Sequence, residues 1–505
     1  MSAKEENKIE PVNQTTEVTP KNSTASKVQE GNSQKGTTNM PIIPLAEPPK
    51  PLTMNDVNSI EELYNAYVNG KVVDFPPWIV RTEKGLEIDS QELFIHISDT
   101  QNILSVKLGN AKGIVLYIYT DGYYKLWNDS DCKAFIKSFL PRRIRRAKYW
   151  EEVFKELRTE YANTDEEELN ANEDIVIFKN GVLNIRTGEL SDYDPKNLCT
   201  IQIPCDYKKG LKLEDASTAN KFFHDITGGN EEDIATLLEV IGAVISNVKC
   251  SRFKKLLILK GAGNTGKSVF RELLIALIGL ENSHTLDIKQ LHGTFGLGGI
   301  YGKRLIGSGD MKFSRLPEID KIKELTGNDH VNVELKYQNS FTTQFRGFLL
   351  FNCNDLPSFG GDRGKHVYDR FLIISCDNVI PPEERDPQLL EKLLAEKEII
   401  VSVAIQYLQQ AIDRDYKFTE SERTKKNREE YMIRNNSLAL FLKECCVIGE
   451  GRTNTSFFKE RYKNWCKENG LEPEKANDIT KILVNDHKVV KGKSYSEYYE
   501  LTIKN

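Results

Sequence analysis

The sequence has 505 residues, of which 39% are apolar, enough for about three domains with hydrophobic cores. Its net charge of −5 excludes a global basic field, so any contact with nucleic acid has to come from local patches. No stretch approaches the ~18 apolar residues of a membrane span, the N-terminus lacks the apolar core of a secretory signal, and the nine cysteines lack metal-ligand spacing. We therefore expect a cytoplasmic protein in a reducing compartment, with no membrane contact, zinc site or disulfide framework.

Residues 1–53 are predicted to form a disordered tail and linker. They contain no Phe, Trp or Tyr and are rich in Ser, Thr, Asn, Lys, Glu and Pro. Such a composition buries too little apolar surface to offset the entropy of ordering. The stretch IIPLAEPPKPL at residues 42–52 is typical of an extended linker, with a short docking peptide as the alternative.

Residues 54–212 are predicted to form an N-terminal α+β region. The stretch VLYIYTDGYYKLW at 115–127 alternates around Asp121-Gly122, which indicates a hairpin. Helices are expected over 130–140 and 141–162. A second hairpin pattern covers 174–190, with turns at Asn180-Gly181 and Thr187-Gly188. Residues 218–247 are expected to be helical, with a break at Gly228-Gly229.

A basic cluster opens the helix expected from residue 141. Its members are Arg142, Arg143, Arg145, Arg146 and Lys148. Two interpretations stay open, a solvated helix face and a contact with a phosphate backbone. Arginines at the start of a helix oppose the helix dipole, and this cost favours a functional reason for them.

A phosphate-binding loop is predicted at residues 261–268, GAGNTGKS. It follows an apolar strand at 256–260 and precedes a stretch with helical spacing at 269–279, which is the context that this motif requires. Glycines let the loop turn its N–H groups inward, and the helix start adds partial positive charge. Lys267 is expected to neutralise the β- and γ-phosphates of ATP, and the Ser268 hydroxyl to bind Mg²⁺. The candidate nucleotide-binding residues are Gly261, Ala262, Gly263, Asn264, Thr265, Gly266, Lys267, Ser268 and Val269.

Hydrolysis also needs a carboxylate and a residue that orients water. Asp310 closes a strand that starts at Lys303, and we expect it to bind Mg²⁺, with a turn-capping role as the alternative. Asn354 follows the third apolar strand and is the first choice for orienting the attacking water, with Asn352 as the reserve.

Arg370 precedes a fourth apolar run, FLIIS, and is expected to reach the γ-phosphate bound by a neighbouring subunit. An arginine supplied in this way raises the rate by orders of magnitude. Arg363 is the second choice, and local pairing is the alternative interpretation.

The sequence resembles the superfamily 3 helicases of the AAA+ class, in the branch of phage, plasmid and poxvirus primase-helicases. Four stretches carry this resemblance and follow one another in the order of the family motifs: GAGNTGKS, GKRLIGSGD, residues 322–357 and YDRFLIIS. The stretch FKNGVLNIRTGEL is also similar to the region that precedes the ATPase in those proteins. The resemblance covers roughly residues 90–380. It implies an α/β P-loop AAA+ domain at 213–385 that works as a hexameric ring around DNA. It also implies that Lys267 and Ser268 bind nucleotide, Asp310 is the Walker B acid, Asn354 is sensor 1 and Arg370 is the arginine finger.

The sequence departs from this family pattern in three ways. Met311 and Lys312 follow Asp310 where the family often has further acids, and Asp369-Arg370 replaces an arginine pair. No primase centre is visible, because Asp129-Ser130-Asp131 lies in a polar turn and zinc-ribbon spacing is missing. Whether a primase acts from a separate chain is left open.

In such rings a hairpin carries DNA-binding residues into the pore. The stretch VNVELKYQNSFTTQF at 331–345 fits this pattern, with Lys336 placed to meet a phosphate and Tyr337 to stack on a base. An ordinary hairpin with a solvated tip is the alternative.

The tail is divided into a charged helical connector at 386–436 and a winged-helix-like domain at 437–505. Three helices are expected at 436–446, 453–470 and 476–487, followed by a hairpin at 488–503, and this pattern is typical of a winged helix. Lys481, Lys488 and Lys491 are the candidate contacts to duplex DNA, with a protein-docking winged helix as the alternative.

These features together predict an ATP- and Mg²⁺-dependent replicative DNA helicase of a mobile element, acting on single- and double-stranded origin DNA as a homo-oligomer. The alternative is an initiator or loader that assembles on DNA without unwinding it. A small-molecule kinase is the third hypothesis, which the length and the missing lid signature disfavour.

Overall fold

The computed structural model describes residues 50–108, 114–160, 164–292, 297–311, 315–316, 319–334, 340–359, 364–471, 473–485, 487–493 and 496–504. Residues 51–505 form the unit that is described below. The predicted disordered tail therefore lies almost wholly outside the described residues. At its end, Leu52 forms a parallel β-bridge with Val73.

In the N-terminal region, helices share a core with a four-stranded sheet in the order β5-β4-β3-β6. The helices are α1 (Ile60–Val68), α2 (Ser90–Thr100), α3 (Asp129–Ser138) and α4 (Ala147–Glu160). The strands are β3 (Ile103–Lys107), β4 (Ile114–Thr120), β5 (Tyr123–Trp127) and β6 (Thr164–Asp165), with a separate hairpin of β1 (Ile79–Thr82) and β2 (Gly85–Ile88). The first predicted hairpin is confirmed. Asp121 at φ 51° and Gly122 at φ 94° form its two-residue turn, as such a turn requires.

The helix expected from residue 141 begins later, at Ala147, and this prediction was wrong in its start. The amides of Ile144 and Arg145 both donate to the carbonyl of Pro141, which closes a separate turn. The Arg145 guanidinium then donates to the carbonyl of Lys137 at the end of α3. The turn thus satisfies the end of one helix before the next begins.

The second predicted hairpin is confirmed as β7 (Ile175–Phe178) and β8 (Gly181–Asn184), extended by β9 (Glu189–Ser191) and β10 (Gln202–Ile203). Their sheet has the order β10-β7-β8-β9. The helical stretch also breaks where predicted, into α5 (Ser217–Thr227) and α6 (Glu231–Ile245), with Gly228 as a left-handed cap.

The centre of the fold is a five-stranded parallel sheet in the order β12-β13-β17-β11-β19. Its strands are β11 (Leu256–Lys260), β12 (Ser283–Thr285), β13 (Leu305–Met311), β17 (Phe348–Cys353) and β19 (Phe371–Ser375). Strands covered on both faces have near-continuous apolar runs, and those of β11, β17 and β19 are buried almost throughout. The expected mixed α/β fold with a parallel sheet is therefore present.

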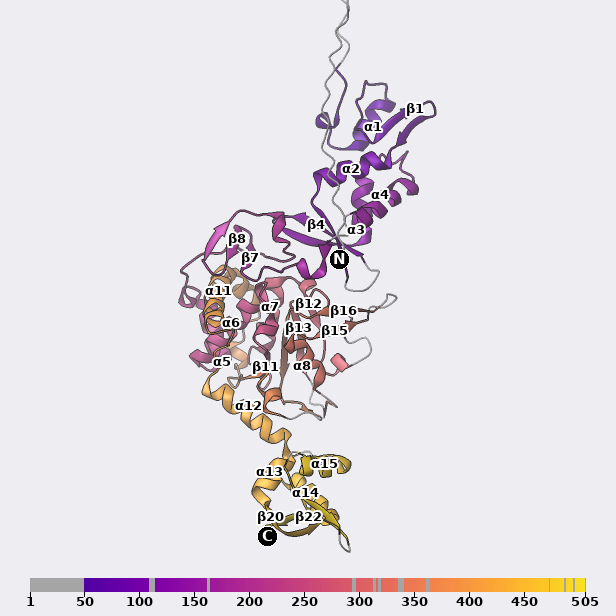
Figure 1. The fold of residues 1–505 in the computed structure, drawn as a ribbon. Helices are drawn as coiled ribbons and strands as arrows, with labels where there is room; N and C mark the ends of the chain where they lie inside the picture. The colour runs from indigo at the N-terminus through magenta and orange to yellow at the C-terminus, as the bar shows by residue number, and fades with distance from the viewer. Residues whose placement is uncertain are drawn as a thin grey trace, which may run out of the picture. The chain divides into compact units, whose positions relative to one another are not determined.

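Helices cover both faces of this sheet (Figure 1). α6, α7 (Lys267–Ile278) and α11 (Lys397–Asp413) share one core with it, together with strands β7 and β8. α8 (Asp320–Gly327) and α9 (Lys365–Tyr368) lie in the core of the other face. Two small strand pairs flank the sheet, β14 (Arg315–Leu316) with β18 (Ser358–Phe359), and β15 (His330–Val333) with β16 (Phe341–Gln344). The tip of the second pair, with Lys336 and Tyr337, lies outside the described residues.

The region predicted as a charged connector contains α10 (Leu389–Ala395), α11 and α12 (Glu422–Asn435). α11 packs on α6 and buries its apolar side chains in the same core as α7. Two fully buried carboxylates of α6 bind the segment between α11 and α12 and the first turn of α12. Glu239 accepts from Arg414 and Thr419, and Asp233 accepts from Ser421, Arg423 and Thr424.

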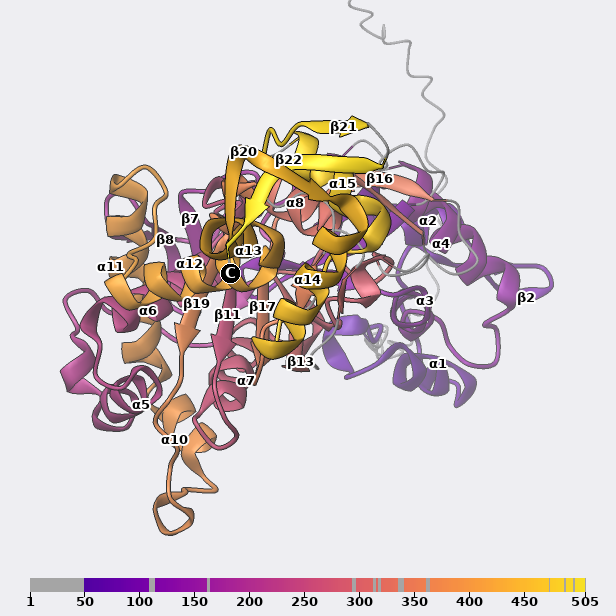
Figure 2. The ribbon, with the colours of Figure 1, turned by 90° about the horizontal axis from the view of Figure 1, so that it is seen from below.

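The C-terminal residues have a core of their own. Three helices occur as predicted: α13 (Ser437–Cys445), α14 (Thr455–Glu468) and α15 (Ala476–Asn485). The predicted hairpin is β21 (Lys491–Lys493) with β22 (Glu497–Ile503), and a strand that was not predicted, β20 (Cys446–Asn454), completes the sheet β20-β22-β21 (Figure 2). Among the described residues, no helix is both long and apolar enough to cross a membrane.

Candidate nucleotide-binding site

The predicted phosphate loop connects β11 to α7 at the edge where the parallel strands end. Gly261 follows β11, and its amide donates to the carbonyl of Cys353, at the end of β17, across 3.1 Å. A Cβ atom on Gly261 would lie 2.0 Å from the carbonyl oxygen of Cys376, so no other residue fits there. α7 then starts at Lys267, and its first-turn N–H groups face this edge.

A hollow of about 450 Å³ opens at this edge. It is bounded by the loop, by the end of β13 and by the end of β17. Its lining residues are Gly263, Asn264, Thr265, Gly266, Lys267, Ser268, Val269, Gly309, Asp310, Cys353 and Asn354. Three segments that are distant in the sequence therefore meet around one space: residues 263–269 of the loop, Asp310 and Asn354. Gly261 and Ala262 form the start of the loop and do not line the hollow.

Lys267 is buried, and its ammonium group is held by the loop itself. The Nζ atom donates to the carbonyls of Gly261, at 2.8 Å, and Ala262, and to the hydroxyl of Thr265 at 3.1 Å. A cation therefore lies within the concave side of the loop, where its charge favours an anion. Ser268 is exposed at the hollow and has its hydroxyl available to a ligand.

Asp310 lies next to the last residue of β13, is exposed and lines the same hollow. The two glycines that interrupt this strand, Gly307 and Gly309, differ in their surroundings. A Cβ on Gly307, which has φ 155°, would lie 1.6 Å from the Leu350 carbonyl oxygen, whereas nothing lies within 4 Å of a Cβ on Gly309. The pairing of β13 with β17 shifts between Ser308 and Met311, and such bulges re-aim side chains.

Asn352, in β17, and Asn354, just after its end, differ in their surroundings. Asn354 is exposed and lines the hollow. Asn352 is completely buried, and neither its amide nitrogen nor its amide oxygen has a hydrogen-bond partner among the described residues. Side chains two apart along a strand share a face, so Asn352 lies on the same face of β17 as Phe348 and Leu350, in the core that α7 shares.

Two cysteines beside the loop are neutral thiols. Burial raises the pKa of Cys353 and that of Cys376 to about 12, which the nearby cation of Lys267 only partly opposes. A thiolate is the nucleophilic form of cysteine. The arrangement therefore does not favour thiol chemistry at the hollow near neutral pH.

Arg370 lies away from the hollow. Its carbonyl accepts from the amide of Leu256, the first residue of β11, whereas the phosphate loop follows the last residue. The strand between them spans roughly 16 Å at about 3.3 Å per residue. The Arg370 guanidinium donates to the Lys323 carbonyl and, at 2.7 Å, to Thr326, both in α8. Burial lowers the pKa of Arg370, and the carboxylate of Asp329 opposes this shift.

Sequence reasoning missed Arg271, which lies one turn after Lys267 on α7. Its Nη2 atom donates to the Thr285 hydroxyl at 2.7 Å and to the Gly307 carbonyl at 3.4 Å. Its Nε atom is buried without a partner among the described residues, and burial lowers the pKa of the group. The signal was a cation four residues after Lys267 in a helix, VFRELLIALI, whose only other charged residue is Glu272.

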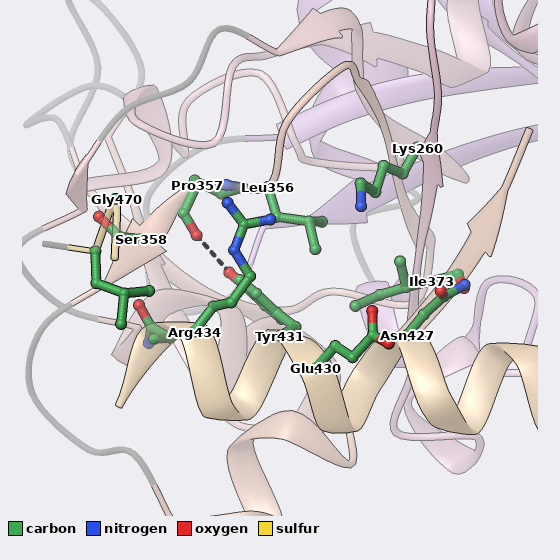
Figure 3. A pocket seen from close by; sticks show the side chains of 12 residues that line it. Lys260, Leu356, Pro357, Ser358, Ile373, Asn427, Glu430, Tyr431, Arg434 and Gly470 are labelled. Atoms are coloured by element: carbon green, nitrogen blue, oxygen red, sulfur yellow. Dashed lines mark hydrogen bonds between the residues drawn. The ribbon is translucent and has the colours of Figure 1, made fainter. Parts of the chain in front are cut away.

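A second cavity, of about 80 Å³, lies beside the loop that follows Asn354. Figure 3 shows Lys260, from the end of β11, on one side and the α12 residues Asn427, Glu430, Tyr431 and Arg434 on the other. The Tyr431 hydroxyl donates to the carbonyl of Pro357. Gly470 and Leu471 of the C-terminal region also line this cavity.

Of the candidate DNA contacts, only those near the C-terminus are described. Lys481 is exposed on α15. The Lys488 ammonium donates to the Asn485 carbonyl at 2.7 Å, and Lys491 forms an ion pair with Glu497 at 2.9 Å, so both have local partners.

Two segments of the chain match known family models. Residues 107–228 match a model described as "D5 N terminal like", and residues 259–370 match a family of unknown function, DUF5906. The first match contains the stretch FKNGVLNIRTGEL, and the second contains the whole GAGNTGKS loop together with Asp310, Asn354 and Arg370.

One curated relative is an uncharacterized mitochondrial protein, ymf21, of Marchantia polymorpha. It is 30% identical over 125 residues, which cover 22% of this chain and 66% of that protein, slightly less than two thirds of its length. Among solved structures, the chain is similar to two apo structures of the NrS-1 C-terminal region. The first has a TM-score of 0.45 at 10% identity and covers 83% of this chain and 100% of the other. The second has a TM-score of 0.43 at 9% identity and covers 83% and 99%.

Proposed function

We propose that this protein is an ATP-dependent replicative DNA helicase of a phage, a plasmid or another mobile element. The observation that carries this proposal is the single hollow that brings together Lys267, Ser268, Asp310 and Asn354. A loop of N–H donors, a lysine, a hydroxyl and a carboxylate at the ends of neighbouring parallel strands are what a Mg²⁺-nucleotide requires.

Each residue has a distinct role in this proposal. The loop N–H groups and Lys267 bind the β- and γ-phosphates. Ser268 and Asp310 are the residues that would hold Mg²⁺, which would neutralise charge on the phosphate oxygens. Asn354 orients the attacking water. All four side chains line the hollow, and within the described ranges those of Ser268, Asp310 and Asn354 form no ion pair or side-chain hydrogen bond.

The proposal includes assembly into a homo-oligomer, with a hexameric ring as the expected form. Arg370 lies near the opposite end of β11 from the phosphate loop, so it does not serve the hollow of its own chain. A site of this kind is completed by an arginine from the next subunit, which is the role that we propose for Arg370.

Two further features support an action on DNA in replication. The D5 N-terminal-like match covers the stretch on which the resemblance to primase-helicases partly rests. The C-terminal region has three helices and a three-stranded antiparallel sheet, a layout that suits a winged-helix domain for duplex DNA. We propose that Lys481, which is exposed on α15, contacts the duplex together with Lys488 and Lys491.

The experiment that tests the proposal combines ATP turnover with strand displacement on a forked DNA substrate, with Lys267→Ala as the matched inactive protein. A helicase shows Mg²⁺-dependent ATP turnover that DNA stimulates, together with displacement that the Lys267→Ala protein lacks. Turnover that DNA stimulates without displacement favours the alternative, an initiator that assembles at an origin without unwinding it. Turnover that DNA leaves unchanged overturns both.

A further inference from the structure

The N-terminal region carries a concentrated positive charge that the nucleotide site does not use. Residues 132–150 contain seven Lys and Arg residues and no Asp or Glu, in a chain whose net charge is −5. These cations are Lys133, Lys137, Arg142, Arg143, Arg145, Arg146 and Lys148. We call them the 133–148 basic surface. Such a segregation of charge is a local electrostatic footprint rather than an average surface.

Part of this surface is fixed by packing. The Lys137 ammonium lies 3.9 Å from the centre of the Trp150 ring, and that of Lys133 lies 4.6 Å from the centre of the Phe154 ring. Arg145 is half-buried and donates to the Lys137 carbonyl, so a structural role accounts for it. These contacts hold α3, the 141–146 turn and α4 together.

Arg142, Arg143 and Arg146 have no such structural role. All three side chains are exposed, and none forms an ion pair with a carboxylate in the described part of the chain. The nearby carboxylate of Glu61 accepts from the backbone amide of Arg142. Three neighbouring guanidinium groups beside the positive end of α4 repel one another and the helix dipole. A bound polyanion removes that repulsion.

We propose that the 133–148 basic surface binds the phosphate backbone of nucleic acid independently of sequence, with Arg142, Arg143 and Arg146 as the principal contacts. Guanidinium groups bind phosphate oxygens in a bidentate manner, which suits this role better than lysine does. The inference deepens the proposed function, because it assigns a DNA-holding site outside the ring pore and outside the C-terminal domain. It rests on that function only for the identity of the nucleic acid.

The test measures binding without nucleotide, so it does not depend on ATP hydrolysis. The full chain is titrated into a labelled single-stranded DNA and into the same sequence as a duplex, over a series of salt concentrations. The variant is Arg142→Ala/Arg143→Ala/Arg146→Ala. The matched control, Lys71→Ala/Lys84→Ala/Lys107→Ala, removes three exposed cations from the same region and changes the net charge equally.

We expect the arginine variant to bind about tenfold more weakly at moderate salt, while the lysine control stays within about twofold of the unchanged protein. The slope of log affinity against log salt should fall by about 2.1 for the single strand and about 2.7 for the duplex, at about 0.7 and 0.9 per lost phosphate contact. Each slope change is compared with the value expected for its own substrate, and the substrate that shows its full expected change is the one held at this surface. Unchanged thermal unfolding midpoints in both variants show that the fold is intact.

Failure of this inference is distinguishable from failure of the proposed function. If the unchanged protein binds DNA and the arginine variant matches the lysine control, the basic surface is a solvated face and only this inference is overturned. If the unchanged protein binds no DNA under any salt condition, both are overturned.

Discussion

The Tyr431 hydroxyl on α12 donates a 2.7 Å hydrogen bond to the carbonyl of Pro357, three residues after Asn354. Tyr431 is fully enclosed, and burial raises the pKa of its hydroxyl well above the usual value, so it stays a donor. This bond connects the end of the strand that lines the nucleotide hollow with the helix that leads to the C-terminal region.

We predict that Tyr431→Phe lowers the free energy of unfolding by about 1–3 kcal/mol, because it leaves the buried Pro357 carbonyl without its partner. Denaturant titration measures the change. Tyr64→Phe is the control, since Tyr64 is half-exposed and should change stability by less than about 0.5 kcal/mol. Equal effects of the two substitutions would contradict a role of this bond.

Asp310→Asn should reduce ATP turnover by about 100-fold or more, because the amide removes the negative charge that the metal needs while keeping the size of the side chain. Asp355→Asn is the matched control. Asp355 is also exposed and follows Asn354, but it does not line the hollow. Steady-state ATP turnover with Mg²⁺ measures this effect. Unchanged turnover in the Asp310→Asn protein would show that Asp310 does not bind the catalytic metal.

Asn352→Leu should raise stability in the absence of nucleotide. The buried amide has no partner among the described residues, and a residue of similar size without polar groups avoids a penalty of about 1–3 kcal/mol. If Asn352 acts at the nucleotide, the same substitution also diminishes the rise in melting temperature that Mg²⁺-ATP produces. Thermal unfolding with and without ligand measures both effects, and a less stable variant would show that the amide is satisfied.

Arg370→Ala should lower ATP turnover by about 10³-fold if the arginine acts on a neighbouring subunit. Mixing this variant with Lys267→Ala should then restore part of the activity, because interfaces form in which an intact loop faces an intact arginine. An arginine that only stabilises α8 through Thr326 and the Lys323 carbonyl gives no such recovery. The mixing ratio that gives the highest turnover is the readout.

Gly307→Ala should destabilise the protein by about 4 kcal/mol or more, or prevent folding, since the new Cβ would meet the Leu350 carbonyl at 1.6 Å. Gly309→Ala, two residues along the same strand, has open space and should cost less than about 1 kcal/mol. Comparing the unfolding midpoints of the two proteins tests whether β13 approaches β17 this closely.

Short-range patterns in the sequence were sufficient to predict much of the fold. The phosphate loop was predicted together with its strand and helix because a motif, an apolar run and helical spacing agree there. The hairpins around Asp121-Gly122 and at 174–190 followed from turn residues that tolerate left-handed backbone. The placement of Asp310 and Asn354 at one hollow follows from parallel strands ending at a common edge.

Other features depend on tertiary contacts and could not be predicted from the sequence. β20 contains Gly449 and Gly451 with positive φ and has an irregular register, so its sequence resembles a loop. The late start of α4 depends on a hydrogen bond from Arg145 to the end of α3. The α8 partners of Arg370 and the position of Arg271 over Gly307 involve residues far apart in the chain, which no short-range pattern encodes.

The carboxylates of Asp233 and Glu239 determine how far the chain can be truncated from its C-terminal side without loss of the fold. A chain shortened to end at Asp413 would leave both charges enclosed in apolar surroundings without their cations, at a cost of about 3–5 kcal/mol for each broken pair. A chain ending at Asn435 would keep every one of those partners. The smallest autonomous piece that contains the parallel sheet is therefore expected to extend through α12, far beyond its last strand.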